Sequence, residues 1–293
     1  MMKELFYKLR KYELRIRKAV NSQMQGNFHS VFKGSGLEFD DVRAYQYGDD
    51  VRTIDWNVSS KGDDTYVKTF KEEKEQNLFF ILDVSASQYI GAENCQKIDI
   101  GREICGVLTI SALKEGSSVG LLCFSDQREI YLKPNKGIKH AVGLIGSMTK
   151  LVPKSLKTSV SKAINVALNI IKRKSIIVMV SDFVDDNYEQ ELKALAKRHD
   201  LIVIHVADAR ETALPPLGIV PLLDKETNQT LWINSSSPEF RNKIIGQFSA
   251  KQQKLEKLCQ QHAANYLFVQ TDEDYVPKLV KLFRIRNRTR IKK

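Results

Sequence analysis

Short apolar runs alternate with longer amphipathic segments along most of the chain. The apolar runs are rich in Val, Ile and Leu and are typical of buried strands. The longer segments carry apolar residues three and four positions apart, which is typical of helices with one buried face. This pattern predicts strands over residues 78–83, 118–124, 176–181, 201–207 and 265–270, and helices over 97–114, 137–149, 159–173, 188–198, 239–263 and 274–284. The alternation predicts an α/β fold, with a mostly parallel sheet covered by helices on both faces.

Two pairs of apolar runs depart from this rhythm. Residues 119–124 and 129–132 are only a few polar positions apart, which predicts an antiparallel hairpin at the sheet edge. Residues 217–223 and 230–233 flank a polar turn and predict a second hairpin, inserted between a strand and the long helix.

The N-terminal quarter has a different texture. Residues 3–20 predict a basic amphipathic helix, whereas residues 26–76 are rich in Gly and Asp with short strand-like pieces. We expect the Asp and Arg residues there to pair with one another as a structural charge network that fixes an irregular β segment. The chain is therefore divided into an N-terminal helix and small β-rich segment (1–76), an α/β domain (77–285) and a basic tail (286–293).

Composition narrows the class of protein. Hydrophobic residues make up 42% of the chain and charged residues 28%, as in soluble globular proteins. No apolar stretch reaches the roughly 18 residues that a membrane-spanning helix needs, and the N-terminus lacks the pattern of a secretory signal. The four cysteines show no C-x-x-C spacing, and Cys105, Cys123 and Cys259 lie within apolar patterns. We expect these three to be buried free thiols in a reducing cytoplasm.

The net charge of +11 raises the question of nucleic-acid or membrane contact. Much of the excess lies within residues 3–18 and 284–293. No aromatic residues are interleaved there as in a base-stacking surface. We therefore expect no sequence-specific nucleic-acid binding, and basic termini that are solvated or contact a membrane surface.

Candidate chemistry follows two of the predicted strands. Asp83, Ser85 and Ser87 come directly after the strand over 78–83, and Asp182 follows the strand over 176–181. Open α/β sheets bind ligands beyond the carboxyl ends of their strands. Carboxylate and hydroxyl oxygens suit Mg²⁺ or another hard divalent cation. The D-x-S-x-S pattern alone is also compatible with an ordinary turn, because Asp and Ser are common turn residues.

The order of these residues resembles the metal-ion-dependent adhesion site of von Willebrand factor A domains. Thr158 supports the resemblance because it lies between the two strands, just before a predicted helix. The family often has Gly before this Thr; here it is Lys157, and Thr149 is the alternative ligand. The resemblance implies an Mg²⁺ or Mn²⁺ ion held by Asp83, Ser85, Ser87 and Thr158, with Asp182 acting mostly through water.

A second resemblance covers residues 26–271. It rests on G-x-G-x-E-F from Gly34, R-x-Y from Arg43, G-D-D-x-R from Gly48, I-D-W from Ile54 and D-A-R-E from Asp208. This ordered set resembles the bacterial domain-of-unknown-function 58 family, whose fold is von Willebrand factor A-like and Rossmann-like. Many members have transmembrane helices ahead of this region. Members are commonly encoded beside MoxR-type AAA+ ATPases, which implies an adaptor or co-chaperone role.

The chemistry of the site favours binding over catalysis. Two carboxylates and three hydroxyls leave a divalent ion able to take one more anionic ligand, such as an acidic side chain of a partner protein. A hydrolase would need a positioned base or nucleophile near the ion. Ser85 and Ser87 have no neighbouring His, His205 is expected to lie in the core, and no P-loop pattern is present. A Mg²⁺-dependent hydrolase and a nucleic-acid-binding protein with basic termini remain the alternatives.

Overall fold

The computed structural model describes Tyr7 and residues 37–291, apart from 61, 63, 73–76, 93–94, 213–215 and 225–228. The helix expected over residues 3–20 therefore lies outside the described residues, except for Tyr7. No helix in the described ranges is long and apolar enough to cross a bilayer.

The main sheet has six strands in the order β12–β9–β8–β3–β6–β7. Neighbouring strands are parallel, except that β6 and β7 are antiparallel. The predicted mostly parallel sheet with an antiparallel edge hairpin is thus confirmed. The strands are β3 (Asn77–Asp83), β6 (Ser118–Phe124), β7 (Arg128–Asn135), β8 (Ile176–Ser181), β9 (Asp200–Ala207) and β12 (Asn265–Gln270).

Helices cover both faces of this sheet. On one face α3 (Lys97–Lys114), α4 (Ile138–Lys150) and α9 (Val276–Ile291) share an apolar core with the strands. On the other, α5 (Val160–Ile170), α6 (Glu189–Arg198) and α8 (Pro238–Gln261) form a second core. Strands that are buried on both faces explain why β3 and β8 are continuous apolar runs.

The C-terminal helix runs past residue 286, the expected start of the basic tail, and ends at Ile291. Arg286 is buried in this helix, and its guanidinium group donates to the Asp200 carboxylate at 2.5 Å and to the Asn265 side chain. One of the basic residues of this terminus therefore holds α9 against β9 and β12 and is not available to a polyanion.

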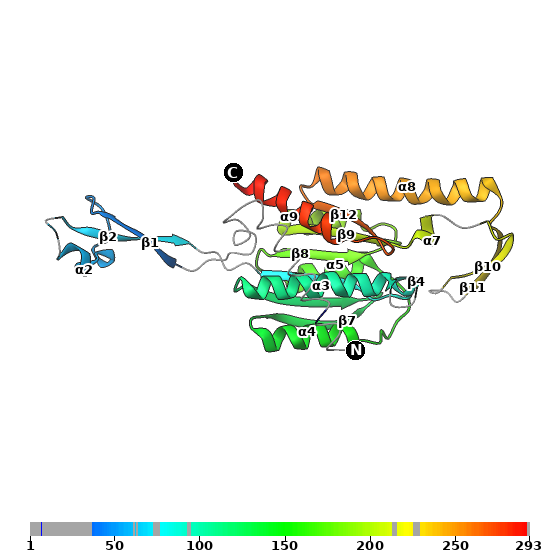
Figure 1. Ribbon diagram of the computed structural model, residues 1–293, viewed down its shortest axis with the longest axis horizontal. Coiled ribbons are helices and arrows are strands. Elements are labelled where there is room, and N and C mark those ends of the chain that lie inside the picture. The colour runs from blue at the N-terminus through cyan, green and yellow to red at the C-terminus, as the bar shows by residue number, and fades with distance from the viewer. Residues whose placement is uncertain are drawn as a thin grey trace.

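Smaller elements lie around the carboxyl ends of the strands. The 3₁₀ helix η2 (Ala86–Tyr89), the short pair β4 (Gly91–Ala92) and β5 (Cys95–Gln96), and α7 (Ala209–Thr212) follow β3 and β9. Beyond α7, β10 (Ile219–Asp224) and β11 (Gln229–Asn234) form the second predicted hairpin, a separate antiparallel ribbon (Figure 1). Ile219, Leu223 and Trp232 of this ribbon are more than half exposed.

A small N-terminal unit lies apart from the sheet (Figure 1). In it β1 (Leu37–Ala44) pairs antiparallel with β2 (Tyr66–Glu72), next to η1 (Val51–Thr53) and α2 (Trp56–Ser59). The Arg43 guanidinium makes two hydrogen bonds to the Asp49 carboxylate, at 2.7 and 2.8 Å, and Asp55 caps α2. The charge network expected from the sequence is therefore present, and it fixes the turns of this unit.

The expected core residues are also confirmed. Cys105, Cys123 and Cys259 are buried free thiols, whereas Cys95 is exposed. His205 is buried, and its Nδ1 lies 2.8 Å from the Tyr266 hydroxyl. The histidine is thus a satisfied core residue, as its place in an apolar strand predicts.

Candidate metal-binding site

Asp83 is the last residue of β3, and its side chain is fully buried at the carboxyl edge of the sheet. Its Oδ1 accepts the Ser85 backbone N–H at 3.0 Å, so the chain turns sharply after the strand. Its Oδ2 accepts the Ser181 hydroxyl at 2.6 Å, which joins the end of β3 to the end of β8. These two hydrogen bonds hold the carboxylate between the ends of the neighbouring strands β3 and β8.

Ser85 and Ser87 present their hydroxyls to each other at the start of η2. The two Oγ atoms are 3.1 Å apart, and both side chains are buried. The Ser87 hydroxyl also approaches Asp182, where its hydrogen bond lowers the pKa of that carboxyl. The D-x-S-x-S turn and the residue after β8 therefore form one polar cluster, as their positions in the sequence predict.

Asp182 is bound to a lysine that the sequence reasoning did not single out. Lys97 begins α3 with no exposed surface, and its Nζ donates to Asp182 Oδ2 at 2.7 Å and to Glu211 Oε1 at 2.6 Å. Glu211 is held in turn by the Asp208 backbone N–H, at 3.0 Å from its Oε2. The ammonium group thus ties the ends of β8 and β9 to α3 through two carboxylates.

The pKa values of the two aspartates of the cluster are shifted in opposite directions. Burial raises the pKa of Asp83 to about 7, and the nearby negative charge of Asp182 adds to this. Burial also works to raise the pKa of Asp182, but the charge and hydrogen bond of Lys97 outweigh it, so the pKa is lowered. Asp182 is therefore ionised and neutralised, whereas Asp83 is the carboxyl that a cation would stabilise in its charged form.

The backbone after Asp182 is strained. Phe183 has φ of 52°, in the left-handed region that non-glycine residues seldom adopt. Its backbone N–H donates to the Ser181 hydroxyl at 3.0 Å, and its ring is buried. Strain of this kind costs about 1–3 kcal/mol and is found mainly at functional sites. Phe183 directly follows Asp182, so this strained residue lies at the polar cluster.

Thr158 lies in the loop before α5, beside the D-x-S-x-S turn. The backbone N–H of Ala86 donates to Leu156 O at 3.0 Å, and Ser159 N–H donates to Ser125 O at 3.2 Å. These bonds bring the loop to the same edge of the sheet, and Thr158 itself is partly exposed there. Thr149, the alternative, lies in α4 and donates its hydroxyl to Ile145 O within the same helix at 2.8 Å. Thr158 is accordingly the better placed of the two.

The donor set fits a hard divalent cation. Asp83, Ser85 and Ser87 offer oxygen atoms alone, which is what Mg²⁺ and Mn²⁺ prefer. Among the described residues no three His, Cys, Asp or Glu side chains form a group that could hold a metal. Serine hydroxyls would therefore have to serve as ligands, and Asp182 is already committed to Lys97. A bound ion would meet this carboxylate through an intervening group and not directly.

Lys97, Glu211 and Ser181 are the members of the cluster that the sequence did not place at the site, although Glu211 belongs to the D-A-R-E motif. A lysine in the first turn of a helix opposes the helix dipole, and this unfavourable position was the available signal. Ser181 is polar within a strand that is otherwise apolar. The positions of Lys97 and Ser181 are unusual in the sequence, but the sequence does not show which residue each of them contacts.

Comparison with known proteins finds similar chains in mycobacteria and distantly similar solved structures. The chain is 25% identical over 283 residues to the uncharacterized proteins Rv1480 of Mycobacterium tuberculosis and Mb1516 of Mycobacterium bovis, covering 96% of this chain and 89% of theirs. Among solved structures, BatB from Bacteroides thetaiotaomicron has 13% identity and a TM-score of 0.44, covering 71% of this chain and 97% of that one. The SpRpn10 VWA domain has 13% identity and a TM-score of 0.37, covering 70% and 93%.

A family model gives the firmer assignment. The model described as "Protein of unknown function DUF58" matches residues 41–254, which is well over half of the 293 residues. The match contains β3, η2, α3, β8 and α7, the elements that carry the polar cluster. The chain therefore belongs to the DUF58 family.

Proposed function

We propose that the chain is a non-enzymatic protein-interaction module whose binding depends on a divalent cation. Mg²⁺ or Mn²⁺ would be held by Asp83, Ser85 and Ser87, with Thr158 as a further ligand and Asp182 in contact through water. The observation that carries the proposal is the buried Asp83 carboxyl beside two serine hydroxyls 3.1 Å apart, at the carboxyl edge of the sheet.

Lys97 gives the proposed site its preference for an anionic partner. Its ammonium offsets the charge of Asp182, so that Asp83 is the carboxylate left to neutralise a divalent ion. When bound, the ion supplies a positive centre that attracts another anion. An Asp or Glu side chain of a partner protein would complete the shell, since Mg²⁺ requires octahedral oxygen coordination. The family resemblance makes a MoxR-type AAA+ ATPase the leading candidate.

The hydrolase alternative lacks a histidine base in the described part of the site. The nearest histidine in the sheet, His205, pairs in register with Ser181, but burial lowers its pKa to about 4 and its Nδ1 is engaged by Tyr266. Nucleic-acid binding through the termini has less support than the sequence suggests, because Arg286 is buried in an ion pair. The four free cysteines support a reducing, cytoplasmic location.

Isothermal titration of Mg²⁺ and Mn²⁺ into the wild type, Asp83→Asn and Asp186→Asn tests the metal site. Asp83→Asn preserves the shape of the side chain and removes a charge that burial disfavours, so the variant should remain folded. We expect it to lose cation binding, whereas Asp186→Asn, at an exposed carboxylate, should bind like the wild type. Equal binding by all three proteins would place the cation elsewhere.

The partner is tested with the purified MoxR-type ATPase of the same genome. We expect a complex with the wild type that dissociates on addition of EDTA and fails to form with Asp83→Asn. A complex that persists in both cases would place the interface elsewhere, with the N-terminal unit from Arg43 to Trp56 as the next surface to test. Metal-dependent hydrolysis of phosphate esters that is lost in Asp83→Asn would favour the hydrolase instead.

A further inference from the structure

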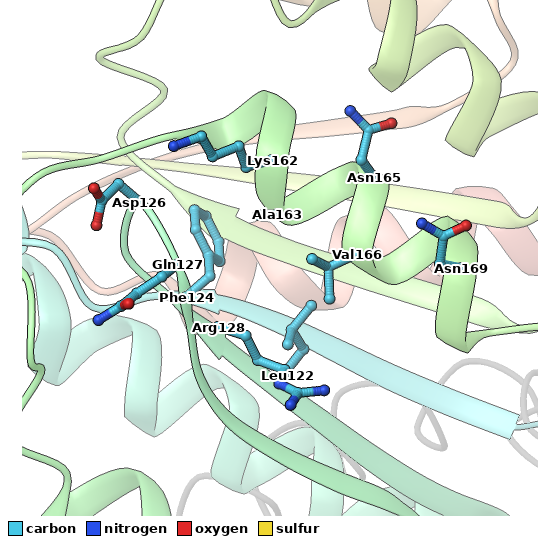
Figure 2. Close-up of a pocket in the computed structure, with 10 residues that line it drawn as sticks. All are labelled: Leu122, Phe124, Asp126, Gln127, Arg128, Lys162, Ala163, Asn165, Val166 and Asn169. Atoms are coloured by element: carbon cyan, nitrogen blue, oxygen red, sulfur yellow. The ribbon is translucent and has the colours of Figure 1, made fainter.

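A pocket that none of the candidate metal ligands lines opens between the β6–β7 hairpin and α5 (Figure 2). Its volume is about 330 Å³. Leu122 and Phe124 of β6 and Val166 of α5 form an apolar floor, and Arg128 and Lys162 stand at the rim (Figure 2). An apolar floor with a few polar groups around it is the usual composition of a ligand pocket.

The pocket exists because the two helical layers reach the sheet edge unequally. On the opposite face, α4 packs beside β6, and Ile130 and Leu132 of β7 join that core. On this face α5 is the last helix in the described part of the chain, and no element described there covers the outer part of β6 and β7. Arg128 pairs with Phe124 and Tyr131 with Leu122 across the hairpin, so these side chains share the uncovered face.

A second pocket of about 220 Å³ lies at the C-terminal end of the same helix. Phe79 and Tyr131 from the sheet and Ile170 at the end of α5 line it, together with Lys172 and Arg173. Asn169 lines the first pocket and Ile170 the second, so the two pockets are neighbours at the end of α5. We call the two pockets together the α5 furrow.

The charge of the furrow is predominantly positive. Arg128, Lys162, Lys172 and Arg173 line it, against a single acidic side chain, Asp126. Within the described residues, none of these four cations takes part in an ion pair shorter than 4.0 Å. Their charges are therefore available to a ligand that carries carboxylates.

We propose that the α5 furrow binds an acidic peptide segment of a partner protein. A bulky apolar side chain of the segment occupies the larger pocket, and Asp or Glu residues on either side of it face the rim cations. A volume of about 330 Å³ lies at the small end of the roughly 300–1,000 Å³ of ligand pockets, which suits one large side chain better than a whole cofactor. The second pocket, with Lys172 and Arg173, would contact the next residues of the same peptide.

Nuclear magnetic resonance of the isotope-labelled full chain tests this directly, with two defined probes. Acetyl-Asp-Phe-Glu-amide should shift the backbone amides of Leu122, Phe124 and Ala163 in a saturable manner. Acetyl-Lys-Phe-Lys-amide should bind at least tenfold more weakly, because its charges repel the rim. The titrations are run in EDTA, so the outcome is independent of the proposed metal site.

Matched variants separate the furrow from the general positive charge of the chain. Lys162→Glu reverses a rim charge, whereas Lys193→Glu makes the same change at an exposed position of α6. We expect at least a tenfold loss of affinity for the acidic peptide with the first and no change with the second. Val166→Phe narrows the pocket without a change of charge and should also weaken binding at least tenfold.

Three results would overturn the proposal. The first is the absence of a saturable shift, or equal shifts with the acidic and basic peptides. The second is an equal effect of Lys162→Glu and Lys193→Glu, which would mean attraction by net charge alone. The third is benzoate binding at the same amides as tightly as the acidic peptide, which would make the furrow a site for a small aromatic acid.

Discussion

Replacement of Lys97 by Met tests the electrostatics of the site most directly. Methionine has a similar length and no charge, so the change leaves the buried Asp182 carboxylate without its cation. Each ion pair of Lys97, at 2.7 and 2.6 Å, corresponds to about 6 kcal/mol of attraction at an effective dielectric constant of about 20, much of it offset by desolvation. Removal of one partner from a buried pair costs about 3–5 kcal/mol. We expect a loss of unfolding free energy in that range at pH 7.5.

The cost of Lys97→Met should depend on pH in a defined direction. In the wild type the pKa of Asp182 is lowered, so its contribution to stability is present above the ordinary pKa of an aspartate and is lost as the pH falls below it. In the variant, burial without Lys97 raises the pKa of Asp182, so protonation relieves the buried charge. The difference between variant and wild type should therefore shrink from pH 7.5 to pH 5.5.

Urea unfolding followed by far-ultraviolet circular dichroism is the suitable assay. Tryptophan fluorescence is a poor reporter because the two tryptophans, Trp56 and Trp232, are 70% and 67% exposed and lie outside the main sheet. Adding Asp182→Asn to Lys97→Met should recover most of the loss, because it removes the uncompensated charge. A cost below about 1 kcal/mol, or one that neither low pH nor Asp182→Asn reduces, would refute this account of the cluster.

Further predictions concern other parts of the molecule. Glu129 accepts hydrogen bonds from the Ser125 hydroxyl and from the Lys154 and Ser155 backbone N–H groups, so Glu129→Ala should loosen the loop before Thr158 and weaken Mg²⁺ binding about tenfold by calorimetry, with Glu189→Ala unchanged. Because burial lowers the pKa of His205 to about 4, the unfolded state alone takes up its proton below about pH 6.5. Stability should fall by up to about 3 kcal/mol between pH 6.5 and 4, and a pH series with His205→Phe should show a smaller fall. Burial raises the pKa of Cys123 and Cys259 to about 12, so Ellman's reagent should titrate one thiol, Cys95, in the native protein and four in urea.

Much of the fold could be predicted because the apolar pattern is strong and local. The strands predicted over 118–124 and 176–181 have those bounds in the structure, since polar residues mark both ends of each apolar run. The long helix was less predictable in its packing. The sequence places five apolar residues on one face of this helix: Phe240, Ile244, Phe248, Leu255 and Leu258. Only Leu255 of these is fully buried, because the first part of α8 leads from the β10–β11 ribbon and reaches the sheet later. Periodicity gives the face of a helix, but not how much of that face a neighbour covers.

The site could be predicted only in part, for a related reason. Asp83, Ser85 and Ser87 are neighbours in sequence, and a strand end brings Asp182 to them, so their proximity follows from parallel topology alone. Lys97 and Glu211 could not be placed in the same way. The contact between Lys97 and Glu211 depends on how α3 and α7 are oriented relative to the sheet. That orientation is set by the packing of the whole domain.

The buried lysine has a consequence for how the chain reaches its native state. Lys97 meets Asp182 and Glu211 across sequence separations of 85 and 114 residues. Closing a loop of this length lowers the conformational entropy of the chain before the contact is made. Contacts of this kind therefore form late in folding. During synthesis Asp83 and Lys97 emerge from the ribosome well before either carboxylate partner. Until β8 has joined β3 and brought Asp182 into place, an uncompensated ammonium group opposes burial of the start of α3. Burial of the start of α3 therefore depends on a chain that extends at least to Asp182, and Glu211 of α7 completes the pairing of the lysine.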